Sequence, residues 1–109
     1  MSLLTLDSTT GTRLAESRLI AVLVIDEEEG AVPLAKALLR GGVDMMELTL
    51  RTPAAIGALR RIREEVPEMT AGIGTILQCD QVDEVVAASA HFGVAPAVNL
   101  KVINYARES

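Results

Sequence analysis

The residues best suited to chemistry stand together in the middle of the chain, in the sequence Glu47-Leu-Thr-Leu-Arg51-Thr-Pro53. Apolar and polar residues alternate here, which predicts a strand that carries Glu47, Thr49 and Arg51 on one face. A carboxyl group can pass protons, and a guanidinium can hold a substrate carboxylate with two parallel hydrogen bonds. We expect Arg51 at the carboxyl end of its strand, which is where parallel α/β folds place their chemistry.

The segments around this strand alternate between strand and helix patterns. Aliphatic runs predict strands at residues 19–25, 45–50, 71–76 and 91–95. Apolar residues at helical spacing, bounded by Gly, Pro or capping residues, predict helices. These helices cover residues 12–17, 26–41, 53–67 and 100–107, with a further one that begins near residue 80.

Some local details of this prediction are specific. Residues 19–25 include no polar side chain, so we expect a strand that is buried on both faces. Thr52 is expected to be the N-cap of the helix that follows the Glu47 strand, with Pro53 at the first helical position. Asp80 is expected to be the N-cap of the next helix. The valines of that helix are expected to face the core: Val82, Val85 and Val86.

The composition excludes several classes of protein. Of the 109 residues 50% are hydrophobic, yet only Phe92 and Tyr105 are aromatic, which is typical of parallel strands buried under helices. A net charge of −5 argues against a nucleic-acid partner. No apolar run is long enough to span a membrane, and the first residues lack the basic flank of a secretory signal. Cys79, the single cysteine, cannot form an intrachain disulfide and fits a reducing cytoplasm.

Two architectures fit four strand–helix units. In an open, doubly wound sheet, helices cover both faces, so Glu47 and Arg51 would be buried among apolar side chains at several kcal/mol per ion. In a (β/α) barrel the same face points into the lumen, where polar residues near the carboxyl ends of the strands line an active site. We therefore favour an α/β fold of TIM-barrel type. Residues 1–109 are expected to form a single domain, a half-barrel preceded by a short N-terminal helix.

Five motifs occur in the order and spacing of a known family. They are Gly41-Gly-Val43, Glu47-Leu-Thr-Leu-Arg51-Thr-Pro53, Glu65-Val-Pro67-Glu68, Gly72-Ile-Gly74-Thr75-Ile-Leu77 and Phe92-Gly-Val-Ala-Pro96. From about Ser17 to Lys101 the chain resembles the 2-keto-3-deoxy-6-phosphogluconate (KDPG) and 4-hydroxy-2-oxoglutarate (KHG) aldolases. The resemblance implies a (β/α) barrel, usually trimeric, that cleaves 2-keto-4-hydroxy acids to pyruvate and an aldehyde. It also implies class I chemistry, which uses a Schiff-base lysine and needs no metal or other cofactor.

The resemblance assigns roles to four residues of this chain. Glu47 matches the general acid/base, which moves protons at the carbinolamine and enamine steps. Arg51 and Thr75 match the groups that bind the carboxylate of the pyruvyl moiety, and Pro96 matches a residue on the pocket floor. The chemistry of the side chains agrees, because a Glu that is partly shielded from water has a raised pKa, as a proton shuttle requires.

The chain departs from the family pattern in two places. Ala97 stands where the family has a Gly after the Pro. The Schiff-base lysine of the family lies on the sixth strand of the barrel, whereas the four predicted units of this chain include only Lys36 and Lys101, and neither matches it. The chain is therefore expected to hold the acid/base and carboxylate-binding half of a site without its nucleophile.

Simpler interpretations exist for several of these residues. Glu47 and Arg51 could form an exposed ion pair worth less than about 1 kcal/mol. Gly72 and Gly74 lack the third glycine of a dinucleotide-binding motif, and we expect them to leave room for a substrate in the lumen. His91 has no second His or Cys nearby, so a structural role is expected rather than metal binding.

Two hypotheses about function follow. The first is a KDPG/KHG-type aldolase that acts in a longer form of the chain on a small 2-keto acid substrate, as a homo-oligomer that family resemblance makes a trimer. The second is a non-catalytic half-barrel that assembles with itself and binds 2-keto acids or has only a structural role. The second hypothesis rests on the missing lysine and on the unpaired edges of the first and fourth predicted strands, which need cover.

Overall fold

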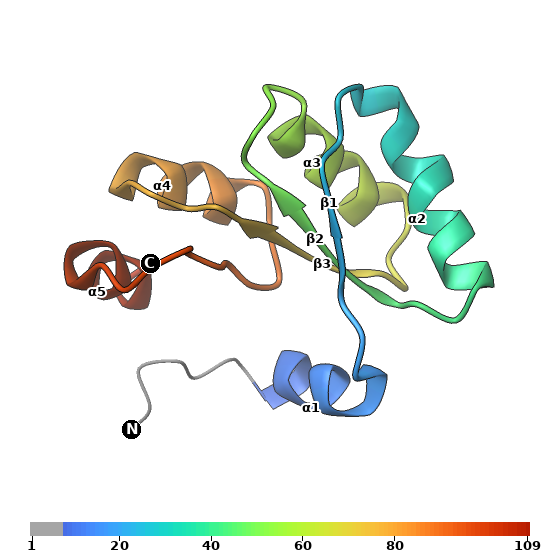
Figure 1. Ribbon diagram of the computed structural model, residues 1–109, viewed down its shortest axis with the longest axis horizontal. Coiled ribbons are helices and arrows are strands. Elements are labelled where there is room, and N and C mark those ends of the chain that lie inside the picture. The colour runs from blue at the N-terminus through green and yellow to red at the C-terminus, as the bar shows by residue number, and fades with distance from the viewer. Residues whose placement is uncertain (1–7) are drawn as a thin grey trace.

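The structure, a computed structural model that describes residues 8–109, is built on a parallel three-stranded sheet (Figure 1). The elements in chain order are α1 (Ser8–Ser17), β1 (Ala21–Leu23), the 3-10 helix η1 (Glu28–Gly30), α2 (Ala31–Arg40), β2 (Met45–Thr49), α3 (Ala55–Glu65), β3 (Thr70–Gly74), α4 (Cys79–Ala87) and α5 (Leu100–Arg107). The strand order is β1-β2-β3, and each neighbouring pair is parallel. The predicted α/β class and the alternation of strand and helix are confirmed.

The fourth predicted strand is present only in part. Segment 91–95 runs parallel to β3, with a single bridge between Ile73 and Gly93. Hydrogen bonds flank the bridge, from Ile73 N to Phe92 O at 3.1 Å and from Val94 N to Ile73 O at 2.8 Å. Within the described residues no strand pairs with the outer edge of this segment. One-sided pairing explains why the ladder stays short.

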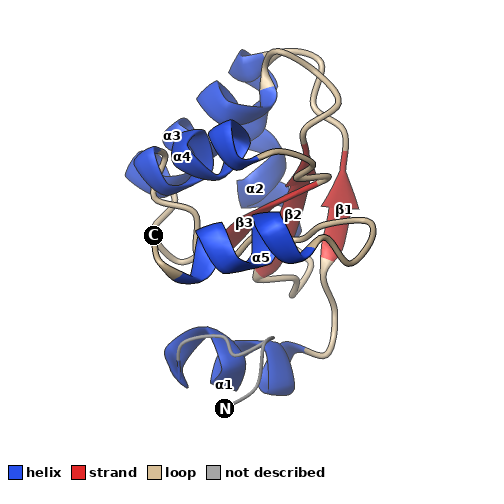
Figure 2. Cartoon of the chain, turned by 90° about the vertical axis from the view of Figure 1, so that its left-hand side faces the viewer, coloured by secondary structure: helices blue, strands red, loops and turns tan. Residues whose placement is uncertain are grey.

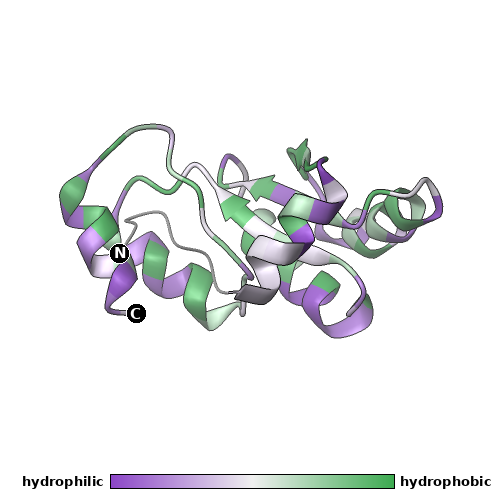
Figure 3. Cartoon of the chain, turned by 90° about the horizontal axis from the view of Figure 1, so that it is seen from below, coloured by the Kyte–Doolittle hydropathy of each residue, from purple (hydrophilic) through white to green (hydrophobic). Residues whose placement is uncertain are grey.

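Helices α2 and α3 cover one face of the sheet, which we call the helix-covered face (Figure 2). Leu48 and Ile73 point from the strands into this layer and meet Leu59 and Ile62 of α3, and all four side chains are buried. The helices carry bands of hydrophobic and hydrophilic residues, as an amphipathic helix on a sheet should (Figure 3). Most of the apolar core therefore lies between the sheet and its helices.

The opposite face of the sheet, which we call the open face, has no layer of helices over it in the described chain (Figure 2). Strand β1 is consequently shorter and more exposed than predicted. The side chains of Val22 and Val24 are 60% and 50% exposed, whereas Ala21 and Leu23 pack against the core. The prediction that residues 19–25 are buried on both faces is wrong, because β1 is an edge strand with cover on one side only.

Helix α1 closes the amino-terminal end of the open face. It lies beyond the point where the strands begin (Figure 1), and Arg13 Nη1 donates a 2.8 Å hydrogen bond to Thr70 Oγ1 at the start of β3. Thr70 and its cross-strand neighbour Met45 are buried, each about 1% exposed. The short helix predicted at residues 12–17 is confirmed, and it begins earlier, at Ser8.

Thr52 does not cap α3 as predicted. This helix begins at Ala55 with Ala54 as its N-cap, and residues 50–54 form a turn. Thr52 Oγ1 instead donates a short hydrogen bond to the carbonyl oxygen of Ile25. Its hydroxyl therefore ties the turn after β2 to the loop after β1, a contact between distant segments that local pattern does not reveal.

The prediction for the start of α4 is also wrong. Gln78 is the N-cap, and Asp80 lies in the first turn of the helix. Gln81 Oε1 accepts the backbone N–H groups of Leu77 at 2.7 Å and Gln78 at 3.0 Å, so the amide does the capping expected of Asp80. On the same helix Val82 and Val85 are buried as predicted, but Val86 is 53% exposed. No helix within residues 8–109 is long and apolar enough to cross a membrane.

Candidate active site

The open face carries Glu47 at its centre. Parallel pairing places Val22 of β1 and Gly72 of β3 on either side of Glu47, and places Gly74 beside Thr49. Paired residues of neighbouring strands point to the same face. The open face therefore presents one carboxyl group between a valine and two glycines.

The two glycines are required by what lies over them. A Cβ atom at Gly72 would come within 2.5 Å of the ring of Phe92, and one at Gly74 would collide with Oε2 of Glu47. The space over these glycines was expected to hold a substrate, but side chains of the protein itself occupy it. Phe92 is a site residue that the sequence reasoning did not select, although the only Phe of the chain beside a glycine-rich strand was an available signal.

The environment of Glu47 suits proton transfer. Its side chain is half-buried, and burial raises the pKa of this carboxyl above its ordinary value of 4.5. Desolvation acts in this direction because it disfavours the charged form. A raised pKa brings the protonated and ionised forms closer to balance near neutral pH, where a group can both give and accept a proton.

Arg51 lies in the turn just after β2 and is exposed to solvent. The backbone N–H of Leu50 donates to Gly74 O at 3.0 Å, which brings the residues after β2 and β3, Arg51 and Thr75, to the same carboxyl edge. Within residues 8–109 the ion pair is Arg61 with Glu28 at 2.7 Å, and Arg51 does not pair with Glu47. The simpler interpretation of these residues as an ion pair therefore does not hold, and the guanidinium is exposed to solvent.

Thr75 has an unusual backbone conformation, with a φ of 64°. A β-branched residue rarely adopts the left-handed region, and holding it there costs on the order of 1–3 kcal/mol. Hydrogen bonds on both sides fix the strained residue: Leu50 N donates to Gly74 O, and Ile76 N donates to Val94 O at 3.1 Å. Such strain is found at binding and catalytic sites, where it gives a side chain a position that a regular strand would not.

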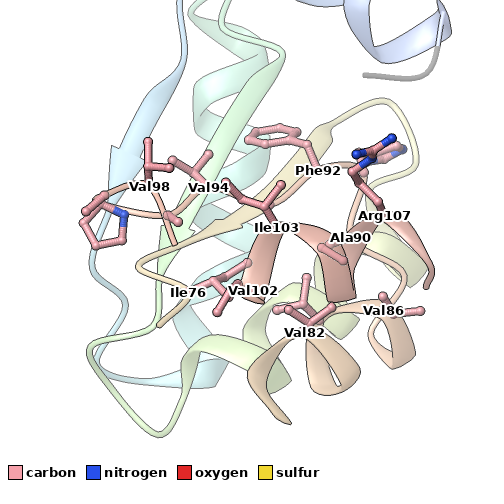
Figure 4. Close-up of a pocket in the computed structure, with 17 residues that line it drawn as sticks. Ile76, Val82, Val86, Ala90, Phe92, Val94, Val98, Val102, Ile103 and Arg107 are labelled. Carbon is pink, nitrogen blue, oxygen red and sulfur yellow. The ribbon is translucent and has the colours of Figure 1, made fainter. Parts of the chain in front are cut away.

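Pro96 lies apart from the other predicted site residues. It contributes to a cavity of 780 Å³ between α4, α5 and the segment that follows β3. Apolar side chains make up most of the wall, as Figure 4 shows for Ile76, Val82, Val94, Val102 and Ile103. Glu47, Arg51 and Thr75 are not among its lining residues. The structure thus brings three of the four predicted residues to one part of the sheet and places Pro96 in a neighbouring apolar wall.

Neither lysine stands on the open face. Lys36 is exposed on α2, and Lys101 is exposed near the start of α5. His91 has the structural role that was expected, because its Nδ1 accepts the backbone N–H of Ala71 at 3.0 Å. Residues 8–109 contain no group of three or more His, Cys, Asp or Glu side chains that could hold a metal ion.

Comparison with known proteins gives a consistent result. The family model described as "Aldolase: KDPG and KHG aldolase" matches residues 11–109. The chain is 45% identical over 89 residues to the 2-dehydro-3-deoxy-phosphogluconate aldolase of Dickeya dadantii (strain 3937). It is 44% identical over 89 residues to the KHG/KDPG aldolase of Escherichia coli (strain K12). Each alignment covers 82% of this chain and 42% of the relative, so the chain spans less than half the length of these proteins.

Solved structures give the same picture. The KDPG aldolase from Legionella pneumophila, with pyruvate captured at low pH as a covalent carbinolamine intermediate, matches with a TM-score of 0.84 and 40% identity. That match covers 91% of this chain and 48% of the other. The enzyme of Zymomonas mobilis ZM4, solved with 3-phosphoglycerate, matches with a TM-score of 0.82 and 35% identity, covering 94% of this chain and 47% of the other.

Proposed function

This chain belongs to the KDPG and KHG aldolase family, and from that premise we propose that it carries the acid/base and carboxylate-binding part of a class I aldolase site. The proposed reaction is the reversible cleavage of a 2-keto-4-hydroxy acid to pyruvate and an aldehyde. The proposal concerns a longer form of the protein, because the chain covers 42% of its relatives and has no lysine beside Glu47. The observation that carries the proposal is the half-buried Glu47 on a face whose carboxyl edge bears Arg51 and Thr75.

We assign the proton transfers to Glu47. A carbinolamine, such as the one captured with pyruvate in the Legionella relative, forms when an amine adds to a keto carbon. It loses water only after its hydroxyl receives a proton, and the enamine left by carbon–carbon cleavage must receive a proton on carbon to become the pyruvyl Schiff base. A carboxyl whose pKa is raised by burial can supply both protons and take them back in the reverse direction.

We assign substrate binding to Arg51, Thr75 and Pro96. The guanidinium of Arg51 can take a carboxylate with two parallel hydrogen bonds, and the Thr75 hydroxyl can add a directed donor. Both follow the ends of neighbouring strands, so one pyruvyl carboxylate can reach both. Pro96 contributes an apolar wall. The amine that attacks the keto carbon is a lysine from the part of the protein beyond these residues, and no metal or other cofactor enters the proposed steps.

The proposed architecture is a (β/α) barrel in which residues 1–109 form the N-terminal half. The exposed valines of the open face support it, because a second half placed over them would remove Val22 and Val24 from water. We further propose a cytoplasmic homo-oligomer, a trimer as the family resemblance implies, that acts on a small molecule. The single cysteine fits the reducing conditions of that compartment.

The test is to trap pyruvate with borohydride on a version extended to the length of the relatives, and to measure the intact mass. We expect one reduced pyruvyl adduct on the extended protein and none on the 109-residue chain. Glu47→Gln should slow adduct formation about 10²- to 10⁴-fold, as loss of a general acid/base does. Arg51→Ala should mainly raise the pyruvate concentration at which adduct formation reaches half its maximal rate.

Glu64→Gln is the matched control, since Glu64 is an exposed carboxylate on α3, away from the open face. An extended protein that forms no adduct, or one in which Glu47→Gln and Glu64→Gln react at the same rate, would contradict the proposal. A stable, closed dimer of the 109-residue chain in light scattering would instead favour the self-assembling half-barrel.

A further inference from the structure

Two bulky side chains fill the space that the glycines of β3 leave open. The ring of Phe92 lies over Gly72, with its Cδ2 and Cε2 atoms 2.5 Å from where a Cβ would stand. The carboxyl of Glu47 lies over Gly74, two residues further along the same face of β3. Gly72 is also the cross-strand neighbour of Glu47. The aromatic ring and the carboxyl group therefore lie side by side on the open face.

The backbone around Phe92 is held firmly against β3. His91 N donates to Ala71 O at 2.9 Å, and Ile73 N donates to Phe92 O at 3.1 Å. The His91 side chain adds a third link, because its Nδ1 accepts the N–H of Ala71 at 3.0 Å. With its main chain fixed in this way, Phe92 keeps its place opposite Gly72, and its ring can leave the glycine only by rotation about its own side-chain bonds. A rigid ring at this place limits the positions that the Glu47 side chain can take.

We propose that Phe92 is a positioning residue for Glu47: its ring, resting on Gly72, confines the carboxyl to the space over Gly74 and keeps water from one side of it. The part of this proposal that concerns catalysis rests on the proposed function, whereas the placement of the Phe92 ring does not. In this proposal Phe92 acts through the proton-transfer group and not on the reacting atoms. Glycine at these two positions leaves the space in which the ring and the carboxyl lie against the strand.

The surroundings of Glu47 leave the ring as the main source of shielding. Strand β1 presents Val22, which is 60% exposed, and β3 presents Gly72 and Gly74 beside Glu47 and Thr70 at its start. Just after β2 the charged group is Arg51, which is exposed to solvent. Segment 91–95 presents Phe92, and α1 presents Arg13, which is bound to Thr70 at the far end. Burial, and no neighbouring charge, raises the pKa of Glu47, which agrees with shielding by an apolar ring.

The first test titrates the Glu47 carboxyl by NMR in the 109-residue chain. Phe92→Ala should admit water and move the pKa of Glu47 down toward 4.5, and Phe92→Leu should move it part of the way. Gly72→Ala should act in the same direction, because its Cβ displaces the ring. If Phe92→Ala does not fold, Phe92→Leu and Gly72→Ala carry the test.

Val82→Ala is the matched control, because Val82 is a buried apolar residue of α4 whose truncation loosens the core away from Glu47. The titration of Glu47 should be unchanged in this variant. A pKa of Glu47 that does not respond to Phe92→Leu and Gly72→Ala, or that shifts equally in Val82→Ala, would show that Phe92 only stabilises the fold.

The second test uses the protein extended to the length of its relatives and follows pyruvate adduct formation against pH. If protonated Glu47 is the acid, Phe92→Leu should shift the alkaline limb of the rate to lower pH and reduce the maximal rate. The pyruvate concentration at half-maximal rate should stay close to wild type, since Arg51 and Thr75 are untouched. An extended protein that forms no adduct refutes the proposed function, whereas an unshifted alkaline limb refutes the role of Phe92.

Discussion

The two faces of the central sheet are made from alternate residues of the same strands, and they differ in helix cover and in polarity. On the helix-covered face, Met46, Leu48 and Ile73 are fully buried among apolar neighbours. On the open face, Glu47 is half-buried and Val22 is 60% exposed. Because successive side chains of a strand point to opposite faces, neighbouring residues of one strand can serve the core and the candidate site.

The open face also carries features that cost stability. Thr75 is held at a φ of 64°, and the carboxyl of Glu47 is partly removed from water. Each feature is unfavourable by itself, since strain costs about 1–3 kcal/mol and desolvation disfavours an ionised group. The helix-covered face must supply the apolar burial that offsets them. Substitutions in the core on the helix-covered face should therefore lower the free energy of unfolding, whereas relief of strain or desolvation on the open face should raise it.

The largest contrast is expected between a core substitution on the helix-covered side of the sheet and a shape-conserving substitution on the open face. Leu59→Ala on α3 removes a side chain with no exposed surface and should lower the free energy of unfolding by about 2–5 kcal/mol. Val22→Thr on the open face keeps the shape of an exposed residue and should change it by less than about 0.5 kcal/mol. Urea denaturation of the 109-residue chain measures both.

This comparison would fail if something covered the open face in solution. A second copy of the chain over Val22 would make Val22→Thr costly and would make the unfolding midpoint depend on protein concentration. The extended protein provides a further check, because there we expect the cost of Val22→Thr to rise toward that of a core substitution.

A smaller effect, of opposite sign, is expected at Thr75. Thr75→Gly removes a β-branched residue from a left-handed conformation, which should raise the free energy of unfolding by up to about 1 kcal/mol. Ser89→Gly is the control, because Ser89 has a similar φ of 62° outside the open face. In the extended protein Thr75→Gly should weaken pyruvate binding and Ser89→Gly should not. Destabilisation by Thr75→Gly would show that the strain is absent or that the hydroxyl holds the fold.

The smallest effect is the pH dependence that Glu47 imposes on stability. Because its folded pKa is raised above the unfolded value, the folded state binds the proton more tightly, and stability falls as pH rises through the folded pKa. Glu47→Gln should therefore have the same free energy of unfolding as the wild type well below pH 4.5, and a higher one at neutral pH. Urea denaturation of wild type and Glu47→Gln at the two pH values measures this difference. Glu64→Gln is the control for the loss of one charge.

A large part of the fold could be predicted from the chain alone. The period-two pattern around Glu47 located β2, and residues 100–107 form α5 within the predicted bounds. Two of the errors concern the starts of helices, and one of these involves a distant segment. Thr52 bonds to the loop after β1 instead of capping its own helix, and Gln81 replaces Asp80 in capping α4. Local propensity cannot report the first choice, because it depends on a partner that only the fold brings within reach. The second choice lies between residues of one turn, and local pattern offered both.

The candidate site divides in the same way. Strand periodicity and side-chain chemistry, which are local properties, were enough to select Glu47 and Arg51, and the resemblance of the ordered motifs to a known family added Thr75. Only the tertiary structure set Phe92 beside Glu47, gave Thr75 its left-handed backbone and placed Pro96 in a separate wall. These features arise from the parallel register of β2 with β3 and of β3 with segment 91–95. Register is decided by the packing of whole strands and helices, which no single stretch of sequence contains.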